Sequence, residues 1–177
     1  MRGSPILGKE FLVCGESCRK VLSMTLIGLS RLHGTHEERE LWSGSTPQVK
    51  KGYVSYEVIL LEEGGKPSPF QGGNAVKHVI KVLHGPEDPV GETHKFRVTL
   101  GYYYISGGRA IHLKRDIYRV DIRGVEGGAL VSLKLEKGLS RIGYDELISK
   151  IMEKAQESSW ESKIVYASFP DEISSCR

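Results

Sequence analysis

The chain has 177 residues, of which 39% are hydrophobic and 27% are charged, and its formal net charge is +3. This length and balance predict a globular chain with a hydrophobic core and exclude an intrinsically disordered one. The small positive charge permits a nucleic-acid or acidic partner without requiring one.

Residues 1–50 differ in composition from the rest and are predicted to be an N-terminal extension, either helical or poorly ordered. Ser17 is a preferred helix N-cap, and apolar residues repeat at helical spacing as far as Leu32. The polar segment that follows contains Ser-Thr-Pro, a composition typical of domain boundaries. One alternative is a start codon assigned too far upstream, with the natural chain opening near Val49.

Residues 51–170 are predicted to form a single α+β domain, followed by a tail at 171–177. Apolar and polar side chains alternate over 53–61, which predicts the first strand. A loop rich in glycine and proline follows. The next segment, 74–84, is predicted to be a helix because Asn74 is a preferred N-cap and a Gly-Pro pair ends the apolar pattern.

Three further strands are predicted at 96–105, 109–123 and 129–137, separated by turns that contain Gly-Gly pairs. Connections this short allow only antiparallel pairing, so the three strands form a meander. In the middle strand the apolar positions change from odd to even numbers. A strand cannot bury both sets on one face, and this predicts a β-bulge near 116–119.

A last helix is predicted from 140 or 143 to about 158, and 164–169 is a candidate for a final edge strand. The order is then strand, helix, three-strand meander, helix and this optional strand. It defines the α+β class, with an antiparallel sheet that carries both helices on one face and leaves the other face partly exposed.

The cysteines Cys14, Cys18 and Cys176 are too few for a disulfide framework, and their odd number favours a reducing, cytoplasmic environment. No apolar run reaches the length of a membrane span, and charges interrupt any signal-peptide core, so no membrane partner is predicted. Asparagine and glutamine are scarce, which is a feature of thermophilic proteins or a chance result in a short chain.

Basic side chains and tyrosines gather on the predicted meander and on the helix before it, and this pattern predicts a surface for RNA or DNA. Cations hold phosphates, and aromatic rings stack on bases. The leading hypothesis is a non-enzymatic protein that binds nucleic acid weakly and without sequence preference. The predicted contact residues are Lys77, Lys81, Arg97, Tyr103, Arg109, Lys114, Arg115 and Arg119, with Tyr102 and Tyr104 as further stacking candidates.

Gly72, Gly73 and Asn74 follow a strand and open a helix, so their backbone N–H groups form a candidate anion site. Neither phosphate-loop fingerprint is present, and the alternative is a flexible helix entry with a cap.

A candidate metal site is formed by two cysteines and two histidines of the N-terminal segment, the ligand types of tetrahedral zinc. Their spacing differs from that of a zinc finger, and the alternative is free thiols with surface histidines. The four residues are Cys14, Cys18, His33 and His36.

Two other classes of function remain open. The first is an interaction or assembly module that pairs with a second copy or another protein through the sheet face or edge, using Tyr103, Ile105, Val120 and Ile122. The second is an enzyme of unknown class, but no catalytic signature occurs and no cofactor is predicted. Its candidate groups are His78, His84, His94 and His112 with Glu62, Glu63, Asp88 and Asp116.

Overall fold

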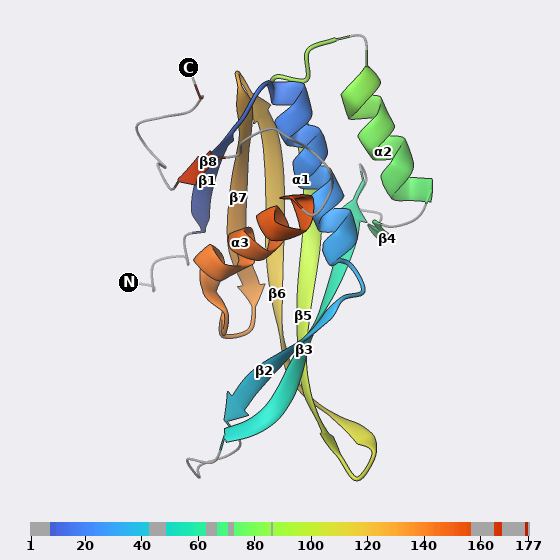
Figure 1. Cartoon of the computed structure of the whole chain (residues 1–177), viewed down its shortest axis with the longest axis vertical. Helices are drawn as coiled ribbons and strands as arrows, with labels where there is room; N and C mark the ends of the chain where they lie inside the picture. The colour runs from blue at the N-terminus through green and yellow to red at the C-terminus, as the bar shows by residue number, and fades with distance from the viewer. Residues whose placement is uncertain are drawn as a thin grey trace.

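The computed structural model describes residues 8–42, 49–62, 67–70, 73–85, 87–156, 165–167 and 176. The three helices formed by these residues are α1 (Cys18–Leu32), α2 (Gly73–His84) and α3 (Gly143–Gln156). The strands formed by these residues are β1 (Lys9–Cys14), β2 (His36–Trp42), β3 (Val49–Leu61), β4 (Pro67–Pro69), β5 (Thr93–Ser106), β6 (Arg109–Val125), β7 (Gly128–Lys137) and β8 (Val165–Ala167) (Figure 1).

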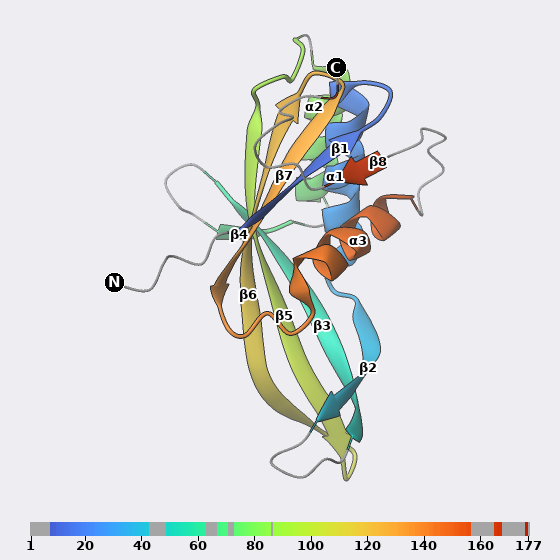
Figure 2. The ribbon, with the colours of Figure 1, turned by 90° about the vertical axis from the view of Figure 1, so that its left-hand side faces the viewer.

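The strands form one antiparallel sheet in the order β2-β3-β5-β6-β7-β1-β8, with β4 paired to β3. Figure 2 shows the sheet curled, with the helices on its concave side. The predicted α+β class, with an antiparallel sheet and helices on one face, is therefore confirmed. None of the described helices is long and apolar enough to cross a membrane.

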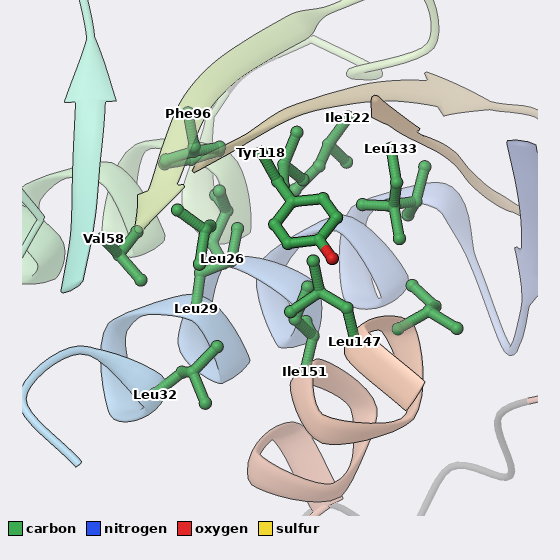
Figure 3. Packing of buried hydrophobic residues seen from close by; sticks show 14 of the residues in the cluster. Leu26, Leu29, Leu32, Val58, Phe96, Tyr118, Ile122, Leu133, Leu147 and Ile151 are labelled. Atoms are coloured by element: carbon green, nitrogen blue, oxygen red, sulfur yellow. The ribbon is translucent and has the colours of Figure 1, made fainter. Parts of the chain in front are cut away.

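Helix α1 lies at the centre of the concave side. Its N-cap is Ser17, as predicted, and the Ser17 hydroxyl accepts a hydrogen bond of 3.2 Å from the backbone N–H of Lys20. The apolar stripe of α1 is fully buried between the sheet and α3, as Figure 3 shows for Leu26 and Leu29. At Gly28 a side chain would meet the backbone of α3, so the two helices cross in close contact.

Residues 1–50 are thus not a separate extension in the part that the structure describes. Elements β1, α1 and β2 fall within this range, and α1 supplies the middle of the core. The polar composition that suggested an extension belongs largely to β2 and to the following segment. Residues 1–7 and 43–48, and the predicted tail apart from Cys176, lie outside the described residues.

The predicted β-bulge is confirmed. The pairing of β6 with β7 shifts register between Ile117 and Tyr118, and the pairing of β5 with β6 shifts between Gly101 and Tyr103. After these shifts, the even-numbered residues of β6 from Tyr118 onward face the core, whereas Ile117 faces outward. The phase change in the sequence therefore marks a real irregularity of the strand.

Asp116 holds this irregular part of β6 to the loop between β7 and α3. Its fully buried carboxylate accepts hydrogen bonds from Tyr102 Oη (3.0 Å), Leu139 N (2.9 Å), and both Arg141 N (2.8 Å) and Arg141 Nη1 (2.9 Å). Gly138 is required beside it, because a Cβ there would lie 2.2 Å from Asp116 Oδ1 and the backbone φ is +108°. Asp116 is therefore a satisfied structural carboxylate.

Cys14 and Cys176 form a disulfide across a sequence separation of 162 residues, so the prediction that the cysteines stay reduced is wrong. Spacing gave no sign of this pairing because the two cysteines meet only through the fold. Disulfides are common in oxidising compartments and also occur inside hyperthermophilic cells. The cysteines therefore no longer support the predicted cytoplasmic environment.

We predict that Asp116→Asn lowers the free energy of unfolding by at least about 2 kcal/mol, because a buried donor left without its acceptor costs about 1–3 kcal/mol. Asp145→Asn is the matched control: Asp145 pairs with Lys9 at a similar distance of 2.8 Å but its side chain is 76% exposed. Its loss should cost less than about 1 kcal/mol. Urea unfolding of both variants measures the difference, and equal effects would contradict the structural role of Asp116.

We predict that reduction of the disulfide lowers the free energy of unfolding by up to about 5 kcal/mol, the chain-entropy value for so long a loop. Calorimetry with and without reductant measures it. Cys14→Ser should match the reduced protein and no longer respond to reductant. Alkylation in denaturant without reductant should modify only Cys18, the free cysteine among the described residues; modification of all three cysteines would show that the disulfide is absent.

Candidate functional site

A groove of about 920 Å³ opens where β3 ends and β5 begins, beside α2. Four of its lining residues are cations and two are carboxylates, so we name it the cationic groove. Helix α2 contributes His78 and Lys81, and the strands β5 and β6 contribute most of the rest. The lining residues are Leu60, Leu61, Glu62, His78, Lys81, Glu92, Thr93, His94, Lys95, Arg97 and Arg119.

Helix α2 is held in place by α1. The Arg19 guanidinium of α1 donates a 2.7 Å hydrogen bond to the backbone carbonyl of Val82 in the last turn of α2, and a second one to the carbonyl of Glu87 beyond it. Ala75 and Val82 of α2 are buried in the main core. The position of His78 and Lys81 thus depends on the same core as the sheet.

Three cations form a row across the outer face of the sheet. Arg97 on β5 is paired in register with Arg119 on β6, which is paired with Lys134 on β7. Directly paired residues of antiparallel strands point to the same face, and here this is the face away from the core, since Phe96 and Val120 beside them are buried. We call Arg97, Arg119 and Lys134 the basic row.

Carboxylates partly balance the basic row. Arg97 Nε lies 3.6 Å from Glu136 Oε1, and Arg119 Nε lies 2.8 Å from Asp121 Oδ1. The side chains of Arg97 and Arg119 remain 41% and 30% exposed, so a ligand in solvent can reach them. Like charges directly opposite each other on neighbouring strands destabilise a sheet, and this arrangement is the kind that an anionic ligand relieves.

A histidine pair, in which His94 is buried and His78 is half-buried, lies at the inner end of the groove. The rings of His78 and His94 contact each other edge to face, with centroids 6.0 Å apart. His94 is 8% exposed, and its Nε2 is 3.0 Å from Glu92 Oε1. His78 packs on the Phe70 ring, and its Nδ1 is buried without a hydrogen-bond partner among the described residues.

Both histidines are held in the neutral form. Burial lowers the pKa of His78, and the Lys81 ammonium lowers it further, whereas Glu62 and Glu92 act in the opposite direction. Burial likewise lowers the pKa of His94 against the opposing effect of Glu92. The groove therefore contains two uncharged rings beside its cations at neutral pH.

A second hollow of about 460 Å³ adjoins the groove and shares Glu62 and His78 with it. It is also lined by Gly73, Asn74 and Lys77, so two residues of the predicted anion site lie here, while Gly72 lies outside the described residues. The Asn74 side chain donates a 2.8 Å hydrogen bond to the Ser68 hydroxyl of β4.

The structure brings together half of the predicted nucleic-acid contacts. Lys77, Lys81, Arg97 and Arg119 line the two hollows. The others lie away from the groove along the far part of the β5–β6 hairpin, which together with β2 and the start of β3 extends beyond the helices (Figure 1). We call this extension the arm. It holds Tyr103, Arg109, Lys114 and Arg115.

The tyrosines are less available than the sequence suggested. Tyr102 is buried and bonded to Asp116, so its use for stacking is excluded. The Tyr103 ring stacks on Tyr53 with centroids 5.3 Å apart, and its hydroxyl is 2.8 Å from His36 Nδ1. One face of the Tyr103 ring is therefore covered.

The predicted zinc ligands have separate partners. Cys14 is in the disulfide, and Cys18 is buried, with a thiol pKa that burial and then the carboxylates Asp88 and Glu92 raise to about 11. His33 Nδ1 accepts a 2.8 Å hydrogen bond from Val58 N. Within the described ranges, no group of three or more His, Cys, Asp or Glu side chains is placed to hold a metal ion.

Some groove residues were missed by the sequence analysis, and some predicted roles do not fit the structure. Lys95 was missed, although it alternates with buried Phe96 just as Arg97 does. Glu92 was missed because only the fold brings it to the histidine pair. Val120 and Ile122, predicted for an assembly face, are buried in the core and unavailable.

No protein-family model matches the chain, and neither a curated protein nor a solved structure matches it.

We predict that the ligand-free protein loses stability as pH falls from about 7.5 to 5.5. The pKa values of His78 and His94 lie below the ordinary value of 6.5, so the unfolded chain binds protons that the folded chain does not. This stability is complete about one pH unit above 6.5 and is lost as pH falls through 6.5 toward the lowered values, by at most about 1.4 kcal/mol per pH unit for each histidine. Urea unfolding in phosphate-free buffer measures the loss.

The histidine assignment is tested by His78→Gln, which should flatten this pH dependence, whereas His84→Gln on the exposed side of α2 should leave it unchanged. An identical slope in all three proteins would contradict the neutral state of the pair.

Proposed function

We propose that this protein binds the phosphodiester backbone of RNA or DNA, with little sequence preference, through the cationic groove and the basic row. The observation that carries this proposal is the register that sets Arg97 opposite Arg119 and in line with Lys134. Lys81 and Lys95 extend the positive charge into the groove at one end of this row. Phosphate contacts of this kind supply most of the affinity of nonspecific nucleic-acid binding.

The shape of the charge favours a polymer over a single small anion. The basic row crosses three neighbouring strands, which are about 4.8 Å apart, so its charge is spread over about 10 Å of surface. The described helices lie on the opposite, concave side and leave this surface open (Figure 2). An extended strand of phosphates can lie across it and continue into the groove.

The residues beside the row explain why sequence preference should be small. On the same face, Arg97 is flanked by Lys95 and Thr99, and Lys134 is flanked by Ser132. None of these is aromatic, so bases have no ring to stack on at this position. The nearby Asp121 and Glu136 carboxylates limit the net charge and hence the affinity.

The competing proposal is assembly through the arm, which another subunit or protein would cover. It is supported by apolar side chains that the arm leaves exposed, including Ile105, which is 50% exposed. An apolar interface is nearly indifferent to salt, whereas phosphate contacts weaken steeply with salt. Light scattering at two protein concentrations measures assembly directly.

We predict that fluorescence anisotropy detects binding of a labelled single-stranded oligonucleotide, with affinity that falls as salt rises. About three displaced counterions give a slope near −2 in log affinity against log salt. Arg97→Gln/Arg119→Gln should weaken binding at least tenfold at low salt and reduce this slope by about 1.4, since two phosphate contacts are lost.

The matched control is Arg109→Gln/Lys114→Gln on the arm, which removes the same charge from exposed positions and should change affinity less than threefold. The groove variant should remain folded, because exposed ion pairs contribute at most about 1 kcal/mol. Equal weakening by both double variants would show that net charge alone attracts the oligonucleotide, and would contradict a site at the groove.

A further inference from the structure

The unpaired Nδ1 atom of half-buried His78 is not explained by the part of the fold that the structure describes. His78 Nδ1 is a buried polar atom without a partner among the described residues, and leaving such an atom unpaired costs about 1–3 kcal/mol. The contact between His78 and His94 gives neither ring a hydrogen bond to the other. This unpaired atom lies at the inner end of a groove whose other polar groups are mostly cations.

We propose that the inner end of the cationic groove is a phosphate subsite, and that a phosphate group enters it together with a proton taken up by the His78–His94 pair. This inference rests on the proposed function, since it concerns one position along the same polyanion. The ligand class is a phosphate group, either an internal phosphodiester or a terminal phosphate of the strand.

The charges that face the pair come from all the elements around it. Helix α2 supplies Lys81, Glu62 follows the end of β3, and the segment that leads into β5 supplies Glu92. Lys95 and Arg97 line the groove farther along β5. While the histidines are neutral, the two carboxylates repel an incoming phosphate and offset Lys81.

A proton on His94 changes this balance. Because Glu92 Oε1 is 3.0 Å from His94 Nε2, protonation converts Glu92 from an uncompensated anion into half of an ion pair. The groove then presents Lys81, Lys95 and Arg97 with less opposing charge. A bound phosphate in turn favours the protonated form of both rings, since an opposite charge nearby raises a histidine pKa.

Linkage makes the two effects equal. If phosphate increases the proton affinity of the pair by some factor, protonation increases phosphate affinity by the same factor. Uptake of one proton limits the change to tenfold per pH unit. Between pH 7.5 and 5.5 we therefore expect affinity to rise between about threefold and tenfold per pH unit.

The test is calorimetric titration of the full chain with an oligonucleotide that lacks terminal phosphates, at pH 6.5, in two buffers with different ionisation enthalpies. The difference between the two heats counts the protons bound. Phosphodiesters do not titrate in this range, so any uptake belongs to the protein. We expect a net uptake of between about a half and one proton.

His78→Gln and His94→Gln should abolish most of this uptake and flatten the pH dependence of affinity, while His84→Gln and His112→Gln should keep both. Glu92→Gln is the sharper variant. It should increase affinity at pH 8, because it removes a repelling charge without removing a ligand contact, and it should lower the proton uptake. A purely structural role of the pair would not produce this gain.

The outcomes separate this inference from the proposed function. If the oligonucleotide binds without proton uptake, the subsite is overturned and backbone binding stays intact. The same conclusion follows if the uptake is unchanged in both His78→Gln and His94→Gln. Absence of oligonucleotide binding at every pH overturns the proposed function. In that case the subsite is tested with inorganic sulfate, a tetrahedral anion whose charge does not change in this pH range. Proton-linked sulfate binding that His78→Gln removes supports the subsite. Absence of sulfate binding overturns it.

A final comparison identifies the source of the phosphate. At pH 7.5 the affinity of an oligonucleotide with a 5′-phosphate is compared with that of its unphosphorylated counterpart. If the 5′-phosphate increases affinity at least fivefold and His78→Gln abolishes this gain, the subsite binds a strand end. Equal affinities with proton uptake retained assign it to an internal phosphodiester.

Discussion

Burial of α1 against the concave side of the sheet is the constraint on which the rest of the structure depends. Its leucine stripe closes the core between sheet and α3, and Gly28 allows the two helices to cross in contact. Arg19, on the same helix, donates to the backbone carbonyl of Val82 in the last turn of α2 and to that of Glu87 beyond it. Because α2 carries His78 and Lys81, the helix that forms the core also sets one wall of the groove.

Sequence patterns predicted the elements that have strong local signals, and tertiary pairing decided the rest. Strands β5, β6 and β7 and helix α3 follow from alternation, Gly-Gly turns and helical spacing, and the bulge follows from the phase change in β6. Strand β2 has the sequence His-Glu-Glu-Arg-Glu-Leu-Trp, which has little β propensity. It forms a strand because its backbone pairs with β3. The Cys14–Cys176 disulfide likewise joins residues that only the fold brings together, so spacing in the sequence could not predict it.

The groove was predictable only in part for the same reason. Alternation along β5 places Arg97 and Lys95 on the face away from Phe96, and this is a local property of the sequence. The register that aligns Arg97 with Arg119 depends on how the hairpin is bulged, which spacing alone does not fix. The meeting of His78 with His94 depends on where α1 holds α2, so no local pattern contains it.

Asp116 and His78 show how a satisfied polar side chain differs from one with an unpaired buried atom. Asp116 has four hydrogen bonds to its two oxygens, and a group so fully satisfied stabilises one conformation and has no capacity left for a ligand. His78 is half-buried, and its buried Nδ1 has no hydrogen-bond partner among the described residues, while Lys81, Glu62 and Glu92 lie nearby. Burial of such an atom without a hydrogen bond costs free energy. Under the proposed phosphate subsite, a charged group that arrives from solution through the groove would relieve this cost.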